Sequence, residues 1–324
     1  MTASIQVIIV SYNTRVLTES CIETILDSDV QRAVVISLVD NGSTDGTCET
    51  VRSRFKQVEI IEETSNLGYA GAINRGADCG HSDYIMISNT DVEFERDAME
   101  EMASFLDANP NVGAVGPQQF YPSGEWQRSY GIVPSVREGL HNLLGITTWH
   151  QTVRRLLWPR VIVDRKPRRV SYIDGAVMMI RRKAFEEVGG FDTSFSHYAE
   201  EADFCVRLQQ AGWETWVVPS ALVMHIRGAS SKRSPEKRVA FAERLVKAKA
   251  QFVSKHSGPG KGYMYGLLQS LHAEKMAAAW WFRERLIRGD KRKIARANQI
   301  MFRNAARFWL REATSFRRQM KHTE

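Results

Sequence analysis

Short β-rich runs alternate with amphipathic helical stretches along the first part of the chain, and this alternation constrains the fold more than any other feature. The runs expected to be strands are Ile5–Val10, Val34–Val39, Val58–Ile61 and Tyr84–Ile87. Three expected helices lie between them, at Leu17–Leu26, Thr47–Phe55 and Tyr69–Cys79. Strands that alternate with helices in this way form βα units and a mostly parallel sheet. We therefore predict an α/β fold whose ligands bind at the carboxyl edge of the sheet.

The remainder of the chain adds a second set of sheet elements and then a helical tail. Further helices are expected at Arg96–Ala108, Arg182–Val188 and Glu200–Ala211, and further strands at Val112–Val115, Tyr172–Ile180, Thr215–Val218 and Ala221–Met224. Residues 117–170 hold five prolines and show weak periodicity, so we expect an irregular functional segment on the side where a second substrate would bind. From Pro235 the pattern is helical, with breaks at 257–260 and 289–290. The predicted domains are 1–230 and 231–324.

Charge is divided unevenly between these two parts. Residues 1–229 hold 21 Lys and Arg against 30 Asp and Glu, whereas residues 230–324 hold 23 against 7. The tail mixes arginine with tryptophan and phenylalanine, which is typical of helices that lie on a membrane surface. We expect contact with an anionic membrane, with docking onto the body or contact within a homo-oligomer as alternatives. Nucleic acid is not an expected partner, because the body lacks a basic groove or a recognised nucleic-acid motif.

The sequence also indicates a compartment. Its apolar runs fall far short of the ~20 residues that span a bilayer, and the N-terminus lacks the pattern of a signal peptide. The four cysteines are scattered without metal-binding spacing, as expected for reduced cytosolic thiols. We therefore expect a cytoplasmic protein attached peripherally to the inner face of the cell membrane.

Two acidic sites and one histidine, widely separated in the sequence, indicate a catalytic site. Asp91 follows an expected strand, the cluster Glu200-Glu201-Ala202-Asp203 begins an expected helix, and His225 follows the last strand. Such a set suits a divalent metal that holds a diphosphate beside a general base. Taken singly, acids in a first helical turn are stabilised by the helix dipole, by ~0.3–1 kcal/mol each. A lone histidine is likewise more often structural, but the joint occurrence favours catalysis.

Small polar residues at two strand ends suggest a nucleotide site. Ser11 and Asn13 follow the first strand, and Asp40 ends the second. Neighbouring strand ends of this kind make a crevice in which a nucleotide binds, and Asp40 could accept a hydrogen bond from a base or a ribose. The alternative is a turn followed by a helix cap.

The glycine-rich segment 65–76 is a more specific signal. Its glycines allow the backbone to approach a ligand at a helix N-terminus, where amide donors and the dipole suit an anion. Close packing of the helix on the sheet is the structural alternative. The candidate residues here are Asn66, Gly68, Gly71 and Asn74.

Taken in order, these motifs resemble those of the family 2 inverting glycosyltransferases, which have the GT-A fold. The resemblance covers about residues 3–230, and the C-terminal part of it is similar to bacterial rhamnosyltransferases that build cell-wall and surface polysaccharides. The motifs are 40–46, 66–68, Asn89-Thr90-Asp91, Gly175-Ala176, 189–192, 200–203 and Val223-Met224-His225.

The resemblance implies roles for individual residues. Asp40 would read the pyrimidine of a dTDP- or UDP-sugar, with Ser11, Asn13 and Asn66 lining the same pocket. Asp91 and His225 would bind Mn²⁺ or Mg²⁺, although Asn89 replaces the family's first aspartate and leaves one charge fewer. Glu201 would be the catalytic base, with Glu200 as the other candidate and Asp203 supporting the acceptor or the helix cap.

The predicted function is therefore a metal-dependent inverting transfer of a sugar, with rhamnose from dTDP-rhamnose as the first choice. The acceptor would be a lipid-linked or polysaccharide glycan in cell-envelope synthesis. An inactive nucleotide-sugar or carbohydrate-binding module is the alternative, because Asn89 and Glu201 depart from the family's usual residues. A sugar nucleotidyltransferase is disfavoured, since no long glycine-rich basic loop follows the first strand.

Overall fold

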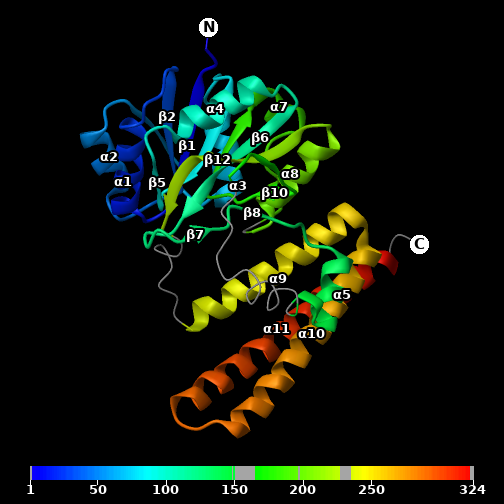
Figure 1. The fold of residues 1–324 in the computed structure, drawn as a ribbon. Coiled ribbons are helices and arrows are strands. Elements are labelled where there is room, and N and C mark those ends of the chain that lie inside the picture. The colour runs from blue at the N-terminus through cyan, green and yellow to red at the C-terminus, as the bar shows by residue number, and fades with distance from the viewer. Residues whose placement is uncertain (1, 148, 150–164, 196–197, 227–234, 322–324) are drawn as a thin grey trace. The chain divides into compact units, whose positions relative to one another are not determined.

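The computed structural model describes residues 2–147, 149, 165–195, 198–226 and 235–321. They form two compact units, which we call the α/β unit and the helical unit (Figure 1). The α/β unit comprises 1–133, 163–196 and 200–232, and the helical unit comprises 134–162, 197–199 and 233–324. The division near residue 232 lies close to the predicted boundary. Segment 134–162 groups with the C-terminal helices because helix α5 (Val136–Leu144) packs against α10 (Pro259–Leu286).

A mixed, mostly parallel sheet forms the centre of the α/β unit, in the order β3-β2-β1-β4-β11-β6-β12-β5. Strands β3, β2, β1 and β4 are mutually parallel, β11 runs antiparallel to β4 and β6, and β12 is parallel to β6. The main strands are β1 (Ile5–Ser11), β2 (Val34–Asp40), β3 (Val58–Glu62), β4 (Tyr84–Asn89), β5 (Val92–Phe94), β6 (Val112–Phe120), β11 (Val177–Arg181) and β12 (Glu214–His225). Short strands are β7 (Trp126–Gln127), β8 (Tyr130–Gly131), β9 (Arg168–Arg169) and β10 (Tyr172–Ile173).

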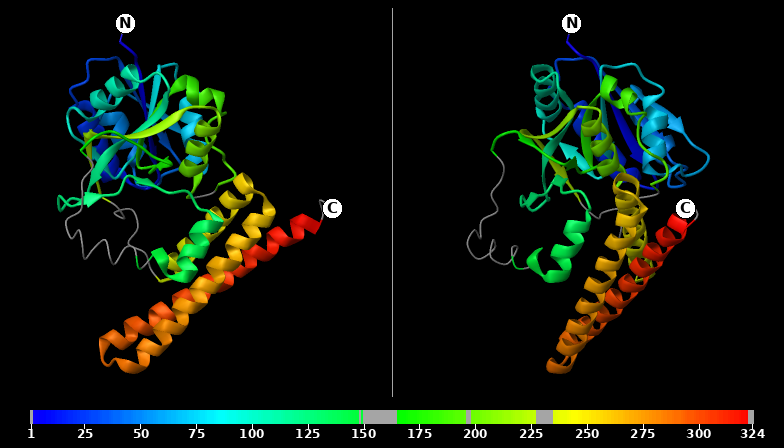
Figure 2. Two further views of the ribbon diagram at one scale, coloured as in Figure 1. Left: turned by 45° about the vertical axis from the view of Figure 1, so that its right-hand side comes forward. Right: turned by 90° about the vertical axis from the view of Figure 1, so that its right-hand side faces the viewer.

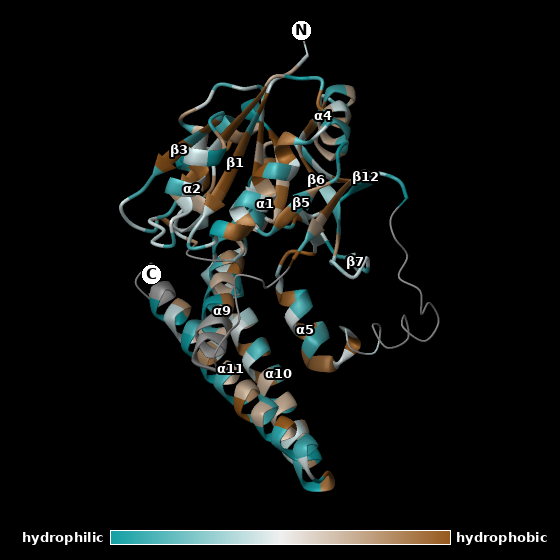
Figure 3. Ribbon diagram, turned by 90° about the vertical axis from the view of Figure 1, so that its left-hand side faces the viewer, coloured by the Kyte–Doolittle hydropathy of each residue, from teal (hydrophilic) through white to brown (hydrophobic). Residues whose placement is uncertain are grey.

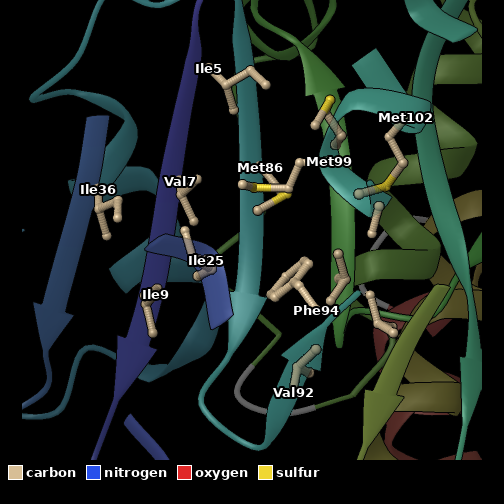
Figure 4. Close-up of a cluster of buried hydrophobic side chains, with 14 of the residues drawn as sticks. Ile5, Val7, Ile9, Ile25, Ile36, Met86, Val92, Phe94, Met99 and Met102 are labelled. Atoms are coloured by element: carbon tan, nitrogen blue, oxygen red, sulfur yellow. The ribbon is translucent and has the colours of Figure 1, made fainter. Parts of the chain in front are cut away.

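Helices cover both faces of this sheet, as expected for strands that are apolar on both sides (Figure 2). Successive side chains of a strand point to opposite faces, so Ile9 joins one buried cluster and Ile8 the other. Figure 4 shows Ile5, Val7 and Ile9 in the first cluster, facing methionines of β4 and α4. The helices of this unit are α1 (Arg15–Leu26), α2 (Thr47–Arg54), α3 (Gly68–Ala77), α4 (Ala98–Ala108), α7 (Arg182–Glu187) and α8 (Glu200–Gln210).

The structure corrects three of the expected elements. The expected strand Tyr172–Ile180 is two strands, β10 and β11, separated by a loop at 174–176 that lies at the candidate site. The two expected strands at 215–218 and 221–224 are one strand, β12, with a register shift between Val218 and Leu222. Segment 117–170 is not irregular throughout, because it contains the end of β6 and helix α5, while 150–164 lie outside the described residues.

The helical unit contains α5 and three long helices, with breaks where the sequence predicted them. These helices are α9 (Pro235–Ser257), α10 (Pro259–Leu286) and α11 (Asp290–Lys321). Among the residues that the structure describes, no helix is both long and apolar enough to cross a membrane.

Candidate active site

The carboxyl edge of the sheet brings together residues from four strands. Ser11, Asp40 and Asn89 end the parallel strands β1, β2 and β4. Strand β12 ends at His225, which is opposite Val92 of β5 in the antiparallel β12–β5 pair. This pairing places His225 beside Asp91, the residue before Val92, although the two are far apart in the sequence.

Asp91 and His225 form a buried carboxylate–imidazole pair. The distance from Asp91 Oδ1 to His225 Nε2 is 3.4 Å, and the two residues are only 7% and 5% exposed. The backbone reinforces the pair, since the Ile226 N–H donates to the Asp91 carbonyl at 2.9 Å. The predicted metal-binding residues are therefore adjacent in the structure.

Gln127 of β7 holds the imidazole from its other side. The Gln127 side-chain amide donates to the His225 carbonyl, which directs Gln127 Oε1 toward the ring, 2.6 Å from His225 Nδ1. His225 Nδ1 therefore carries the proton and donates it, a hydrogen bond that fixes the ring's tautomer. Nε2, the nitrogen that faces Asp91, is left as the one that can bind a cation.

This pair fits a divalent cation. His225 Nε2 and Asp91 Oδ1 are 3.4 Å apart, a separation that lets one cation contact both atoms. Among the described residues no three His, Cys, Asp or Glu side chains are grouped to hold a metal. The protein would thus supply two ligands and leave the other positions to substrate oxygens or water, as is common for Mg²⁺ beside phosphates.

The loop 174–176 connects this pair to the acidic cluster. The Asn89 N–H donates to the Ala176 carbonyl at 2.9 Å, and the Tyr69 hydroxyl donates to the Gly175 carbonyl at 2.5 Å. A Cβ on Gly175 would lie 3.6 Å from Glu201 Cβ and 3.6 Å from the Tyr69 ring. The backbone of Gly175 therefore lies between α3 and the start of α8, where a side chain would fill the space.

The charges of four carboxylates act on Tyr69, the second residue of α3. Burial raises the pKa of the Tyr69 hydroxyl well above its ordinary value, and the charges of Glu200, Glu201, Asp174 and Asp91 raise it further. The predicted metal-binding aspartate and both candidate bases therefore act electrostatically on one phenol. Tyr69 was not predicted as a site residue, because an aromatic residue in a helix ordinarily indicates core packing.

Glu200 and Glu201 differ sharply in their surroundings. Glu200 is 6% exposed, and its Oε2 has no hydrogen-bond partner within the described part of the chain. Burial raises the pKa of Glu200 to about 7, opposed only by a hydrogen bond from its own backbone N–H. Glu201, one residue further, is half-buried beside Gly175.

Asp203, predicted to support the acceptor or the helix cap, is held by an arginine of its own helix. Its side chain is fully buried and accepts a hydrogen bond from Arg207 Nε at 2.8 Å. Arg207 also donates to the Val188 carbonyl at 2.6 Å. Asp203 therefore orients an arginine that ties α8 to the end of α7.

The two residues that precede α8 have an unusual backbone conformation. Tyr198 and Ala199 have φ values of 71° and 70°, in the left-handed region that residues other than glycine rarely adopt. Strained conformations of this kind cluster at functional sites. They immediately precede Glu200 and Glu201, so their backbone conformation sets the direction of the first turn of α8, which carries these two acids.

The predicted nucleotide-binding residues at the first two strand ends are hydrogen-bonded within the loops that follow these strands. Both Asp40 oxygens accept hydrogen bonds from Ser43, at 2.7 and 2.5 Å. Asn13, at φ 54°, accepts from the Thr44 N–H at 2.8 Å. Ser11 is fully buried and bonds to the hydroxyls of α1. Nucleotide contact by these residues remains a prediction.

The glycine-rich segment forms the start of α3. Asn66 Oδ1 accepts from the Gly68 N–H at 2.8 Å, and Gly68 has a φ of 74°, which favours glycine. Gly71 is in close contact with the side chain of Leu67. Asn74 uses both ends of its amide on the Phe191 backbone, at 2.8 and 2.9 Å, so it joins α3 to the 189–192 loop.

Two solved sugar transferases share this architecture. The mannosyltransferase PcManGT from Pyrobaculum calidifontis, solved with GDP-Man and Mn²⁺, superposes with a TM-score of 0.57 at 19% identity, covering 94% of this chain and 86% of that chain. GalNAc-T7, solved with UDP, GalNAc and Mn²⁺, gives a TM-score of 0.61 at 15% identity, covering 84% and 51%. The fold is GT-A, as predicted from the motifs.

Sequence comparison defines the family. The model of "Glycosyl transferase family 2" matches residues 6–189, and the chain belongs to this family. An N-acetylglucosaminyl-diphospho-decaprenol L-rhamnosyltransferase of Mycobacterium tuberculosis is 32% identical over 222 residues, which are 65% of this chain and 72% of that protein. A pre-mycofactocin glycosyltransferase of the same species is 26% identical over 198 residues, 60% of this chain and 38% of that protein. The protein is a glycosyltransferase, which confirms the predicted enzyme class.

Proposed function

We propose that the protein transfers rhamnose from dTDP-rhamnose to a lipid-linked glycan, by a metal-dependent reaction that inverts the anomeric configuration. One observation carries the mechanism: the loop 174–176, which accepts hydrogen bonds from Asn89 and Tyr69, lies beside Glu201, at the sheet edge that also holds the Asp91–His225 pair. The choice of sugar and acceptor is supported by the mycobacterial rhamnosyltransferase, whose name includes a diphospho-decaprenol acceptor.

Asp91 and His225 are the residues that would hold Mn²⁺ or Mg²⁺. A bound divalent cation would neutralise the diphosphate of the donor and so ease its departure. His225 contributes a nitrogen ligand, which suits Mn²⁺ at least as well as Mg²⁺, because Mg²⁺ strongly prefers oxygen. The two solved sugar transferases that contain Mn²⁺ support this choice.

Glu201 is proposed as the catalytic base. It is more exposed than Glu200 and begins α8 beside the Gly175 backbone. The acceptor hydroxyl would give its proton to Glu201 while its oxygen bonds to the anomeric carbon, and the bond from that carbon to the diphosphate oxygen would break. Glu200, with a pKa of about 7, is mostly protonated below pH 7, which limits repulsion between the neighbouring acids.

The acceptor places the reaction at a membrane. A polyprenyl diphosphate carrier is held in a bilayer, so an enzyme that glycosylates it must work at the membrane surface. We therefore propose a peripheral protein at the cytoplasmic face, in the synthesis of a cell-envelope glycan. The excess of Lys and Arg after residue 229 supports this location.

The test is a transfer assay with dTDP-rhamnose, other dTDP-sugars, UDP-sugars and GDP-sugars. Each donor is combined with N-acetylglucosamine on a prenyl diphosphate or on an uncharged soluble tag, with Mn²⁺, Mg²⁺ or EDTA. We expect transfer from dTDP-rhamnose, inversion at the anomeric carbon in the NMR spectrum of the product, and loss of activity with EDTA. Transfer from a GDP-sugar alone would overturn the donor assignment. The absence of both turnover and donor binding by calorimetry would overturn the transferase assignment.

A further inference from the structure

The helical unit is built around a long antiparallel hairpin, α10–α11, whose helices are joined by residues 287–289. Small residues form the seam between the two helices. A Cβ on Gly266 would lie 2.8 Å from Ala313 Cβ, and the Ser270 hydroxyl donates to the Ala306 carbonyl at 2.9 Å. Beside this close approach the buried rings of Tyr265 and Trp309 meet edge to face, with their centroids 5.4 Å apart.

Other helices of this unit contact the hairpin away from its joining loop. Gly262 of α10 packs tightly on Ser254 of α9, and Lys275 donates to the Leu143 carbonyl of α5. The joined end of the hairpin extends past both α5 and α9 (Figures 1 and 2). We call residues 280–303, at that end, the hairpin tip.

The hairpin tip exposes large apolar side chains. Trp281 is 45% exposed, Phe282 60%, Leu286 70% and Ile294 60%. Figure 3 shows hydrophobic residues at the very end of the hairpin, beyond a stretch of both helices that contains hydrophilic and hydrophobic residues. An apolar group of this size on a projecting end is typical of an interaction surface.

The hairpin tip is also strongly basic. It contains eight Lys and Arg against two Asp and Glu. Both acids are already paired, Glu284 with Arg292 at 3.7 Å and Asp290 with Lys293 at 3.0 Å. The excess of positive charge therefore faces solvent around the apolar group.

Arginines lie on the tryptophans of the tip. The Arg285 guanidinium is 3.3 Å from the centroid of the Trp281 ring, and Arg283 is 5.1 Å from that of Trp280. Tryptophan with arginine is the pair that favours the boundary between lipid headgroups and acyl chains. The ring can enter the boundary while the guanidinium binds a headgroup phosphate.

We propose that the hairpin tip docks the enzyme on an anionic lipid bilayer by inserting Trp281, Phe282 and Leu286 between headgroups. The positive charge complements anionic lipid, whereas it would repel the tip of a second copy of the chain. The described helices include none that could span the bilayer, so the contact is a surface attachment. Its use in catalysis rests on the proposed lipid-linked acceptor, but the contact itself is measured without any acceptor.

The apolar part is tested by sedimentation of the full-length protein with phosphatidylcholine vesicles, with and without phosphatidylglycerol. We expect binding only with phosphatidylglycerol, weakened at least tenfold in Trp281→Ser/Phe282→Ser because two buried rings are lost. Leu271→Ser is the matched control, since Leu271 is 56% exposed on α10 outside the tip. It should bind like wild type.

The charged part is tested with Arg285→Gln/Arg288→Gln/Lys291→Gln. Each cation near an anionic surface contributes about 1 kcal/mol, so three losses should weaken binding about a hundredfold. Arg317→Gln/Arg318→Gln, exposed toward the other end of α11, is the control and should bind like wild type.

Activity separates this proposal from the proposed function. Both tip variants should keep wild-type turnover of a soluble acceptor and lose turnover of the vesicle-bound one. Unchanged vesicle binding by both tip variants, or equal binding to neutral vesicles, would overturn the docking proposal. So would self-association in the ultracentrifuge that the tip substitutions abolish. Vesicle binding that responds to the substitutions, without any sugar transfer, would instead overturn the proposed function.

Discussion

Replacing Glu200 with glutamine should stabilise the α/β unit at alkaline pH and leave its stability unchanged in acid. Glu200 is almost fully buried, and its Oε2 has no partner among the described residues. Burial raises its pKa from 4.5 to about 7. At 1.36 kcal/mol per pKa unit, the ionised group costs the folded state about 3 kcal/mol.

The direction in which stability changes with pH follows from the difference in proton binding between the folded and unfolded states. Between pH 4.5 and 7 the folded state holds the Glu200 proton more tightly than the unfolded state does, so stability falls as pH rises. The penalty is absent below pH 4.5, grows through this window and is complete above pH 7. Glutamine has nearly the same shape as glutamate and carries no charge, so Glu200→Gln avoids the free-energy cost of burying an ionised carboxylate.

The assay is thermal unfolding of wild type and Glu200→Gln from pH 4 to 8.5, with EDTA and without nucleotide. For a unit of this size 1 kcal/mol shifts Tm by about 2–4 °C, so the variant should melt about 6–12 °C higher at pH 8. Glu59→Gln removes an exposed carboxylate from β3 and should show no such trend. A Tm difference for Glu200→Gln that does not change with pH would refute the reasoning.

Three further predictions concern single side chains. Glu201→Gln should lower kcat by about 10²–10⁴-fold, the usual contribution of a general base, with donor affinity unchanged in calorimetry. Gln127→Leu should raise the Mn²⁺ concentration for half-maximal activity about 10–100-fold, because it removes the shorter of the two side-chain hydrogen bonds, to Gln127 and Gln119, that orient His225. Asn74→Ala should lower the unfolding free energy in urea by about 1–3 kcal/mol, because it leaves the Phe191 N–H and carbonyl without their partner. Equal kcat, equal metal response or equal urea midpoints, respectively, would contradict these expectations.

Local patterns predicted most of the elements of the α/β unit. Strands β1 to β4 begin at the expected residues, and the helices between them end within about two residues of their predicted ends. These elements are fixed by side-chain periodicity and by nearby capping and breaking residues, which are properties of short segments. The breaks at Gly258 and Gly289 in the tail were found in the same way.

Elements that depend on distant partners were predicted poorly. The run Tyr172–Ile180 is apolar enough for one strand, but the loop at 174–176 interrupts it to contact α3 and the end of β4. Helix α5 was missed because prolines and weak periodicity mask it, and its packing surface is on α10. The register shift in β12 likewise results from pairing with β6.

By itself, the sequence determined the order of the elements, the set of acids and histidine that the proposed reaction would use, and the separation of the negatively charged body from the basic tail. Only the tertiary structure decided the surroundings of each residue. Asp91 lies next to His225, Glu200 is buried, Glu201 is more accessible, and Asp203 is paired with Arg207. Burial and ligand geometry are set by groups remote in the chain. Tyr69 meets Gly175 across 106 positions, and Gln127 meets His225 across 98. No local pattern encodes those distances, whereas the packed sheet edge fixes them.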